Sequence, residues 1–312
     1  MGGSGGGYSN SPPGELAKRI QAIAQDASQA ADRGTFDTDV ASVISATLAE
    51  LNSRDPENIR QHLDVLKSAL EKDIDGTIDL MFGGSVSKRT YAEGLSDIDA
   101  LVCIDRTELA DADPDTVCRY LEDKVTERLP RSVVERDGFA IRVVFSDNTV
   151  IELVPIIRRG ESHLISNEKC TAWIEAHPRA FSEKLTQVNQ ACGNKVVPVI
   201  KLAKSVLAGS MPDNIALSGY HIESLAVAAF DGYGGPFTPK AMLVHLFSQM
   251  PNAIRTPAKD PTGQSRYLDG YLGAEGSLER LMTADAVDRV GRRMRRAESM
   301  CSVEEWRQLL GT

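Results

Sequence analysis

The sequence lacks the cysteine and histidine patterns of zinc-binding and disulfide-rich proteins. Its five cysteines are widely spaced, and neither a CxxC pair nor an HExxH motif occurs. Neither a zinc ribbon nor a disulfide framework is therefore supported. The five histidines are scattered as well. Any metal site is expected to use oxygen ligands, which suit hard cations such as Mg²⁺.

Membrane and export signals are also missing. No stretch approaches the roughly 18 consecutive apolar residues of a membrane-spanning helix. Residues 1–13 contain no apolar segment typical of a secretory signal. The sequence therefore predicts a cytoplasmic protein with reduced cysteines and no membrane partner.

Basic residues are too few to balance the acidic ones. Asp and Glu number 44 and Lys and Arg 35, which gives a formal net charge of −9. Binding to long nucleic acids needs a basic surface, so this function class is disfavoured, whereas a local basic pocket for a small phosphorylated ligand is not. The length of 312 residues suits one large domain or two lobes with a shared core.

Hydrophobic periodicity predicts helices at both ends of the chain and strands in the middle. Residues 1–12 are rich in Gly and Ser and predict a mobile tail. The predicted helices span residues 16–27, 40–51, 59–70, 115–129, 182–207, 218–230, 239–249, 278–297 and 303–310. The predicted strands span residues 78–82, 97–104, 140–145 and 150–157, the last two forming a hairpin through Asp147-Asn148.

These elements predict an α+β fold in which a small mixed sheet with helical cover is followed by a helical lobe. The expected division is a flexible tail (1–12), a core with N-terminal helices (13–165) and a helical lobe (166–312). Residues 252–271, rich in Pro, Gly and Asp, predict a surface loop.

Three acidic residues lie in strands that are otherwise apolar. Asp97 and Asp99 are two residues apart, so on a strand their carboxylates share one face. Such carboxylates repel each other unless a cation lies between them. Glu152 interrupts the apolar run 150–157, where an unpaired carboxylate is costly to bury. A shared divalent metal accounts for all three; the alternatives are a solvated strand edge for the aspartates and a salt bridge to Arg142 for Glu152.

A glycine-serine turn, Gly83-Gly84-Ser85, precedes the acidic pair. Without side chains at 83 and 84, backbone N–H groups can approach a phosphate, and the Ser85 hydroxyl can donate to it. No Gly-Lys-Ser/Thr and no GxGxxG motif is present, so the turn is neither a Walker A loop nor a dinucleotide fingerprint. A simple turn is the alternative. The order of turn, acidic pair and third acid suits two-metal nucleotidyl transfer with pyrophosphate as the leaving group.

These motifs resemble the signature of the polymerase-β-like nucleotidyltransferase superfamily. Gly84-Ser85, Asp97-x-Asp99 and Glu152 match it, although the third acid is more often Asp in relatives. Ser218-Gly219-Tyr220-His221-Ile222-Glu223 looks like a helix of the bacterial cGAS/DncV-like nucleotidyltransferases, the CD-NTases. Asp260-Pro261-Thr262-Gly263 resembles a loop that those enzymes share with oligoadenylate synthetases.

The resemblance implies a two-lobed enzyme with its active site in the cleft between a nucleotidyltransferase core and a helical lobe. Such enzymes condense nucleoside triphosphates without a template into cyclic di- or trinucleotide second messengers and release pyrophosphate. In anti-phage signalling the product activates a separate effector protein. Two divalent ions, Mg²⁺ or Mn²⁺, are implied as cofactors.

The resemblance also implies roles for the acids and the turn. Asp97 and Asp99 would hold the metal ions. Glu152 would complete the metal site and help to activate the attacking ribose hydroxyl. Gly84 and Ser85 would bind the donor triphosphate.

Further nucleotide contacts are implied in the helical lobe. Lys201 resembles the family's triphosphate-binding lysine; an exposed helix charge is the alternative, and Lys204 is a rival for the role. Tyr220 resembles the aromatic residue that stacks on a base, or it belongs to the core. Ser218 resembles a base contact, although Gly219 stands where relatives often carry Ser. Asp260-Pro261 either faces the acceptor nucleotide or simply forms a turn.

Other functions fit less well. Transfer to tRNA or protein, as by a toxin, is one alternative, but a tRNA acceptor would favour a broad basic surface. A silent nucleotide-binding module is another, but it would not need all three acids. Arginines cluster at positions 289, 292, 293, 295 and 296. Because acidic residues share that helix, an ion-paired surface is favoured over binding of a nucleic-acid activator. The C-terminal residues 309–312 are a candidate contact for a regulatory partner protein.

Overall fold

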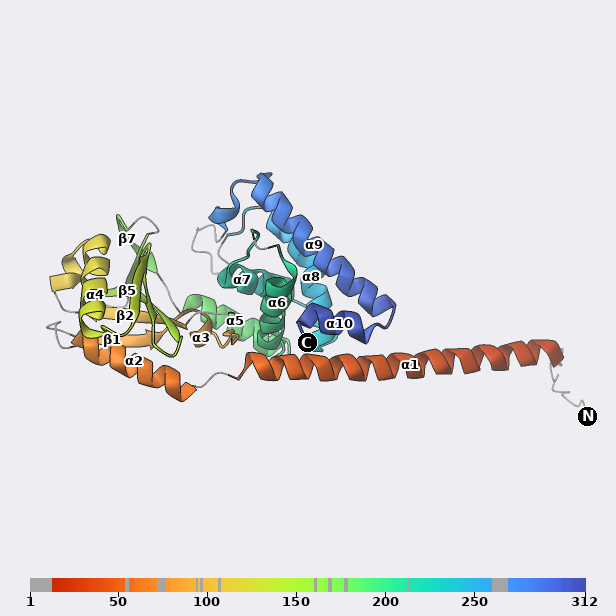
Figure 1. Ribbon diagram of the computed structural model, residues 1–312. Coiled ribbons are helices and arrows are strands. Elements are labelled where there is room, and N and C mark those ends of the chain that lie inside the picture. Colours follow the sequence, from red (N-terminus) through yellow and green to blue (C-terminus); the bar gives the residue numbers. More distant parts are fainter. Residues whose placement is uncertain are drawn as a thin grey trace, which may run out of the picture.

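Two lobes lie side by side in the computed structural model, one built on a sheet and one built of helices (Figure 1). The structure describes residues 13–53, 56–71, 77–93, 95, 98–105, 108–159, 162–167, 170–176, 179–212, 214–259 and 269–312. The predicted tail, residues 1–12, lies outside this range. In the described part of the chain, no helix combines the length and apolar character that a membrane span requires.

The strand lobe contains one mixed sheet with the order β1-β2-β5-β4-β3, extended by β6 beside β5 and β7 beside β6. The strands are β1 Thr77–Phe82, β2 Ile98–Asp105, β3 Val133–Asp137, β4 Ala140–Val144, β5 Val150–Arg159, β6 Ser162–Ser166 and β7 Trp173–Ala176. Among the described strands, only β2 and β5 pair in parallel; the other pairs are antiparallel. The predicted β4–β5 hairpin is confirmed.

Two helices cover one face of this sheet. Helix α2 (Pro56–Glu71) and helix α4 (Pro114–Arg128) bury apolar side chains against it. In β2 the buried residues Ile98, Ala100, Val102 and Ile104 belong to this core. Because side chains alternate along a strand, Asp99 points to the opposite face.

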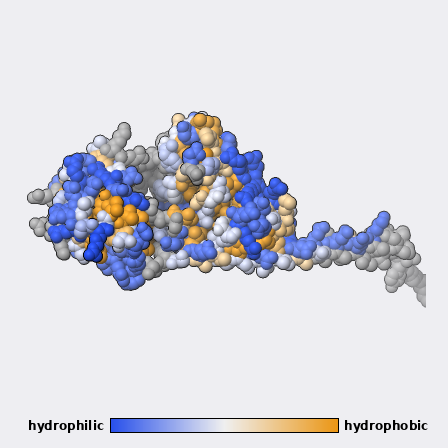
Figure 2. Space-filling view, in the orientation of Figure 1, coloured by the Kyte–Doolittle hydropathy of each residue, from blue (hydrophilic) through white to orange (hydrophobic). Residues whose placement is uncertain are grey.

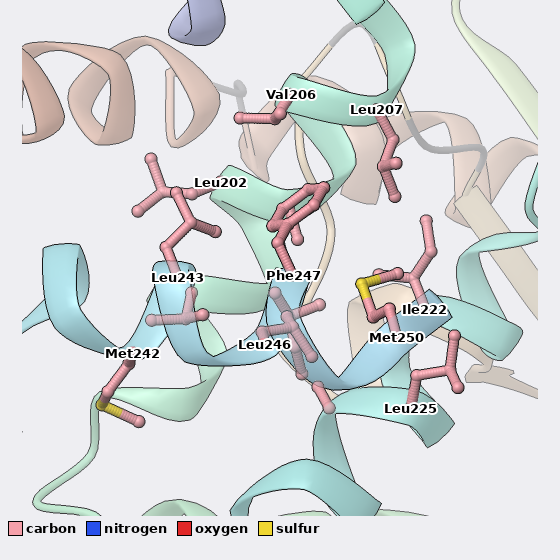
Figure 3. Close-up of a cluster of buried hydrophobic side chains, with 14 of the residues drawn as sticks. Leu202, Val206, Leu207, Ile222, Leu225, Met242, Leu243, Leu246, Phe247 and Met250 are labelled. Atoms are coloured by element: carbon pink, nitrogen blue, oxygen red, sulfur yellow. The ribbon is translucent and has the colours of Figure 1, made fainter. Parts of the chain in front are cut away.

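The helical lobe has its own apolar core. Its helices are α5 Ala180–Ala191, α6 Val196–Ser210, α7 Gly219–Phe230, α8 Pro239–Arg255, α9 Leu278–Ser299 and α10 Val303–Leu310, with short 3-10 turns at Gly270–Leu272 here and at Glu108–Asp111 in the other lobe. Figure 3 shows Phe247 of α8 pointing toward Leu202 and Leu207 of α6. Gly291 of α9 brings two helices close, because a Cβ there would lie 2.9 Å from the Phe247 carbonyl oxygen of α8.

One long helix, α1 (Pro13–Leu51), replaces the first two predicted helices, and that part of the prediction is wrong. The helix continues through Gly34, because one glycine costs a helix only about 1 kcal/mol. Phe36, Val40 and Ile44 of α1 pack into the core of the helical lobe. The preceding part of α1 extends beyond the body of the molecule (Figure 1).

The predicted helix 182–207 is in fact two helices, α5 and α6. Gly193 and Asn194 between them both have a φ of +61°, in the left-handed region that ends a helix. Conversely, α8 continues to Arg255, past the predicted end at 249. The predicted division into 13–165 and 166–312 stays a prediction.

Trp306 of α10 is fully buried in the core of the helical lobe. We expect Trp306→Ala to lower the free energy of unfolding by about 3–5 kcal/mol, because it removes a large apolar side chain and leaves a cavity. Urea unfolding followed by circular dichroism measures this change. Met300→Ala is the control, since this side chain is 64% exposed, and its effect should stay within about 0.5 kcal/mol. Equal effects of the two substitutions would contradict the packing of α10.

Candidate active site

Asp99 and Glu152 lie opposite each other on the parallel strands β2 and β5. Each is half-buried and faces away from α2 and α4, between residues that point into the helix-covered core. Adjacent strands are about 4.8 Å apart, so the two carboxyl groups are neighbours on one face. Arg142 of β4 lies opposite Glu152 on its other side and forms an ion pair with Glu135 at 3.8 Å. The structure is therefore compatible with both predictions for Glu152, a metal site and an arginine neighbour.

Asp97 lies outside the described residues. Among those that the structure describes, no group of three or more His, Cys, Asp and Glu side chains is placed to hold a metal ion. Asp99 and Glu152 nevertheless form a pair of oxygen donors of the kind that Mg²⁺ prefers. The chemistry of the described donors therefore fits a divalent metal.

The glycine-serine turn lies directly against Asp99. The Gly83 N–H donates a hydrogen bond to the Asp99 carbonyl oxygen at 2.8 Å. Gly84 has a φ of +43°, and a Cβ at this position would overlap the Asp99 carboxylate. The structure thus brings Gly84 and Asp99 together, and it explains the glycine by both its backbone conformation and its close contact.

Internal hydrogen bonds define the rest of the turn, which contains the short helix α3 (Gly84–Ser87). The carbonyl oxygen of the buried Ser85 accepts from Thr90 N at 2.9 Å and from Tyr91 N at 3.1 Å. Arg89, between these partners, has a φ of +62°. The segment from Gly83 to Thr90, named here the glycine turn, is therefore a compact folded loop.

A buried cluster of charges lies at the far end of the glycine turn. Glu223 of α7 forms ion pairs with Lys88 and with Lys204 of α6, the latter at 3.0 Å, and accepts a hydrogen bond from the Thr90 hydroxyl. Lys204 Nζ also donates to the Thr90 carbonyl oxygen at 3.0 Å. Burial would raise the pKa of the Glu223 carboxyl, but Lys88 and Lys204 hold it below its ordinary value. This charge cluster joins the turn to the helical lobe.

The two candidate lysines differ in their surroundings. Lys204 is buried within the charge cluster, whereas Lys201 is partly exposed and its Nζ donates to Asn52 Oδ1 at 2.5 Å, just beyond α1. Tyr220 is partly buried, and Lys88 Nζ lies 4.8 Å from its ring centre. Tyr220 therefore lies beside the charge cluster rather than deep in the core.

Ser218 caps the start of α7. Its Oγ accepts from His221 N at 3.2 Å, and its N–H donates to Tyr271 Oη at 3.1 Å. Accepting this bond leaves the Ser218 hydroxyl proton able to donate to another group. Tyr271, which the sequence did not single out, thus supports the start of the helix that carries Ser218 and Tyr220.

Lys88, Thr90 and Glu223 were also missed as site residues. Glu223 carried a signal of the kind used for Glu152, because it is the single acid in the apolar helix α7. Lys88 and Thr90 carried none, since their partners lie more than 100 residues away in sequence.

A second buried polar network supports α7 from the opposite side. His221, Asp269 and Arg280 are fully buried, and Arg280 Nη1 donates to Asp269 Oδ2 at 2.6 Å. His221 Nδ1 forms a hydrogen bond with Tyr271 Oη at 2.9 Å. Asp260-Pro261 lies outside the described residues, so the structure gives no placement for this predicted acceptor loop.

The arginines of α9 are largely ion-paired. Arg292 and Arg295 contact Asp288 at 3.4 and 3.7 Å, and Arg293 contacts Glu305 of α10 at 2.8 Å. Figure 2 shows hydrophilic residues on the side of the helical lobe where these two helices lie. The interpretation as an ion-paired surface is thus confirmed for these three residues.

Comparisons with known proteins identify a matching domain family and a shared fold. Residues 38–189 match the family model of the Second Messenger Oligonucleotide or Dinucleotide Synthetase domain. A search of curated proteins by sequence found no match.

Solved structures share the fold across most of the chain. E. coli MS115-1 CdnC with ATP matches at a TM-score of 0.62 and 18% identity, covering 87% of this chain and 97% of that one. The CdnC:HORMA-ΔN complex matches at 0.62 and 18%, covering 86% and 96%. Vibrio cholerae DncV cyclic AMP-GMP synthase with a linear intermediate matches at 0.62 and 13%, covering 95% and 89%.

The predicted α+β fold, a polymerase-β-like nucleotidyltransferase core with a helical lobe, is confirmed. The chain carries a cGAS/DncV-like nucleotidyltransferase domain, as the sequence motifs predicted. The prediction of an enzyme that makes a nucleotide second messenger is confirmed by this family, and neither a tRNA- or protein-directed enzyme nor a silent module is favoured.

We expect Gly84→Ala to reduce nucleotide incorporation at least about tenfold and to destabilise the fold by about 1 kcal/mol. The new Cβ would overlap the Asp99 carboxylate, and a left-handed φ is strained for alanine. Pyrophosphate release and thermal unfolding measure the two effects. Gly209→Ala in α6 is the matched control, because open space surrounds that position. Wild-type activity in Gly84→Ala would contradict the close contact.

The His221 network predicts a loss of stability at acidic pH. Burial lowers the pKa of His221, so this imidazole binds a proton less readily in the folded chain than in the unfolded chain; Asp269 partly opposes this effect and Arg280 adds to it. Below a pH of about 6.5 the unfolded chain binds a proton that the folded chain does not. The free energy of unfolding should therefore fall as the pH drops from 7 to 5, by at most about 1.4 kcal/mol per unit from this residue.

Urea unfolding of His221→Asn at the two pH values tests this effect. The variant should show a weaker dependence on pH than the wild type. Gln249→Ala, an exposed and non-titrating substitution outside the network, should keep the wild-type dependence. Identical pH dependence in wild type and His221→Asn would refute the role of His221.

Proposed function

We propose that the chain condenses nucleoside triphosphates into a cyclic di- or trinucleotide second messenger, with Asp97, Asp99 and Glu152 as ligands of two Mg²⁺ or Mn²⁺ ions. The observation that carries this proposal is the register of Asp99 with Glu152, with the Gly84 backbone against the Asp99 carboxylate. It places two carboxylates of the kind that hold a divalent ion side by side, one of them directly against a turn whose glycine has no side chain.

The chemistry divides among these residues. When bound, the ions would supply Lewis-acid stabilisation of the charge on the triphosphate. Glu152 would accept the proton of the attacking ribose hydroxyl. The N–H groups of Gly84 and Ser85 would orient the donor triphosphate, so that the hydroxyl meets the α-phosphate in line with the departing pyrophosphate.

The helical lobe would supply the remaining nucleotide contacts. In this proposal Lys201 or Lys204 binds the triphosphate; Lys201 is the better supported of the two, because it is partly exposed, whereas Lys204 Nζ is buried between Glu223 and the Thr90 carbonyl oxygen. Ser218 donates its hydroxyl proton to a base. Tyr220, which is partly buried beside Lys88, stacks on the base.

Two protein partners complete the proposal: an effector activated by the product and a regulatory protein. CdnC, which shares this fold, has been solved in complex with HORMA-ΔN. A cytoplasmic location fits the pool of nucleoside triphosphates on which this synthesis depends.

The test is synthesis from all four labelled nucleoside triphosphates with Mg²⁺ or Mn²⁺, followed by phosphatase treatment. A phosphatase-resistant product with the mass of a cyclic di- or trinucleotide is expected. We expect Asp99→Asn and Glu152→Gln to lower its formation at least about 100-fold, since each removes a metal ligand.

Asp105→Asn is the matched control. Asp105 shares the strand and face of Asp99, but it contacts Arg158, and its variant should keep full activity. Label transferred to added tRNA would instead favour the alternative enzyme. Undiminished synthesis in Asp99→Asn would refute the metal-site assignment.

A further inference from the structure

The glycine turn is held at both ends by different lobes. At one end the Gly83 N–H is bound to the Asp99 carbonyl of β2 at 2.8 Å. At the other end the Thr90 carbonyl and hydroxyl are bound by Lys204 and Glu223. Figure 1 places α3, within the turn, between the two lobes. The position of the turn therefore depends on α6 and α7 as much as on the sheet.

The charge cluster has an unusual composition for a buried site. Lys88, Lys204 and Glu223 have side chains only 10%, 6% and 1% exposed. Two cations and one anion leave a formal charge of +1 in a poorly solvated place, which is costly unless geometry and neighbours offset it. The rings of Phe181 and Tyr220 lie 5.1 and 4.8 Å from Lys88 Nζ and offset part of the cost.

The backbone of the turn needs such support. Arg89 is a non-glycine residue in the left-handed region, a conformation that costs about 1–2 kcal/mol. Such strain persists only where the surroundings fix it. Here the fixed neighbours are Ser85, whose carbonyl binds Thr90 N and Tyr91 N, and the charge cluster, which binds Thr90.

We propose that Glu223 and Lys204 are positioning residues that hold the glycine turn in the conformation that binds the donor triphosphate. This inference rests on the proposed function and adds a role for residues that do not contact the reacting atoms. The turn would bind the triphosphate through the N–H groups of Gly84 and Ser85, so its conformation determines how well these groups meet the phosphate oxygens. A displaced turn binds the triphosphate more weakly in the ground state and the transition state alike.

Such a loss of uniform binding raises KM and leaves kcat nearly unchanged. We therefore expect Glu223→Gln to raise KM for the nucleoside triphosphate about tenfold, with kcat changed less than threefold. Calorimetry with a non-hydrolysable ATP analogue and Mg²⁺ should show an equal loss of affinity. Glu305→Gln, which breaks the ion pair with Arg293 in α10, is the matched control and should change neither value.

A double variant separates positioning from charge. Glu223→Gln raises the formal charge of the cluster from +1 to +2, and adding Lys204→Met returns it to +1. If the turn is positioned by these contacts, the double variant keeps the raised KM, because the Thr90 carbonyl has lost Lys204 and the Thr90 hydroxyl has lost its charged acceptor. If net charge alone matters, the double variant regains the wild-type KM, and the proposal is overturned.

Thr90→Val covers the case in which Glu223→Gln does not fold. Valine keeps the shape of threonine but removes the hydroxyl that binds Glu223, and it should raise KM about threefold. An unchanged affinity for the analogue in folded Glu223→Gln or Thr90→Val overturns the inference. A wild type that binds the analogue but makes no product refutes the proposed function alone, and the affinities of the variants still decide the inference.

Discussion

The parallel pairing of β2 with β5 is the constraint on which the site depends. It places Asp99 beside Glu152 and turns both away from the helix-covered core. Two neighbouring carboxylates repel each other, so this register is favourable only where a positive group lies nearby. Arg142 on one side and a divalent cation on the other can each meet that requirement. The repulsion between the two carboxylates therefore favours the binding of a divalent cation beside them.

The glycine turn connects this pair of carboxylates to the helical lobe. Its start is bound to β2 and its end to α6 and α7. A strained residue, Arg89, lies just before the anchored end. The tightly packed helical core beneath gives the anchors a rigid base, because buried apolar side chains resist displacement. The turn is thus a shared part of both lobes rather than an appendage of the sheet.

Local spacing was enough to find Gly84, Asp99 and Glu152, because strand periodicity and turn chemistry act over a few residues. It was not enough to find the contact of Thr90 with Glu223, which joins residues 133 apart in sequence. The prediction of the helix ends was wrong for a related reason. Gly34 did not end α1, since packing of Phe36 and Val40 outweighed its weak propensity, whereas Gly193 and Asn194 did end α5.

The long helix α1 has a geometric consequence. Phe36, Val40 and Ile44 pack into the core of the helical lobe, and residues 13–35 precede these contacts. At 1.5 Å per residue, this projecting part is about 34 Å long. A rotation of the helical lobe by about 5° would move its tip by about 3 Å, far more than it would move the turn at the junction. The position of the helix tip is therefore a sensitive measure of the orientation of the helical lobe.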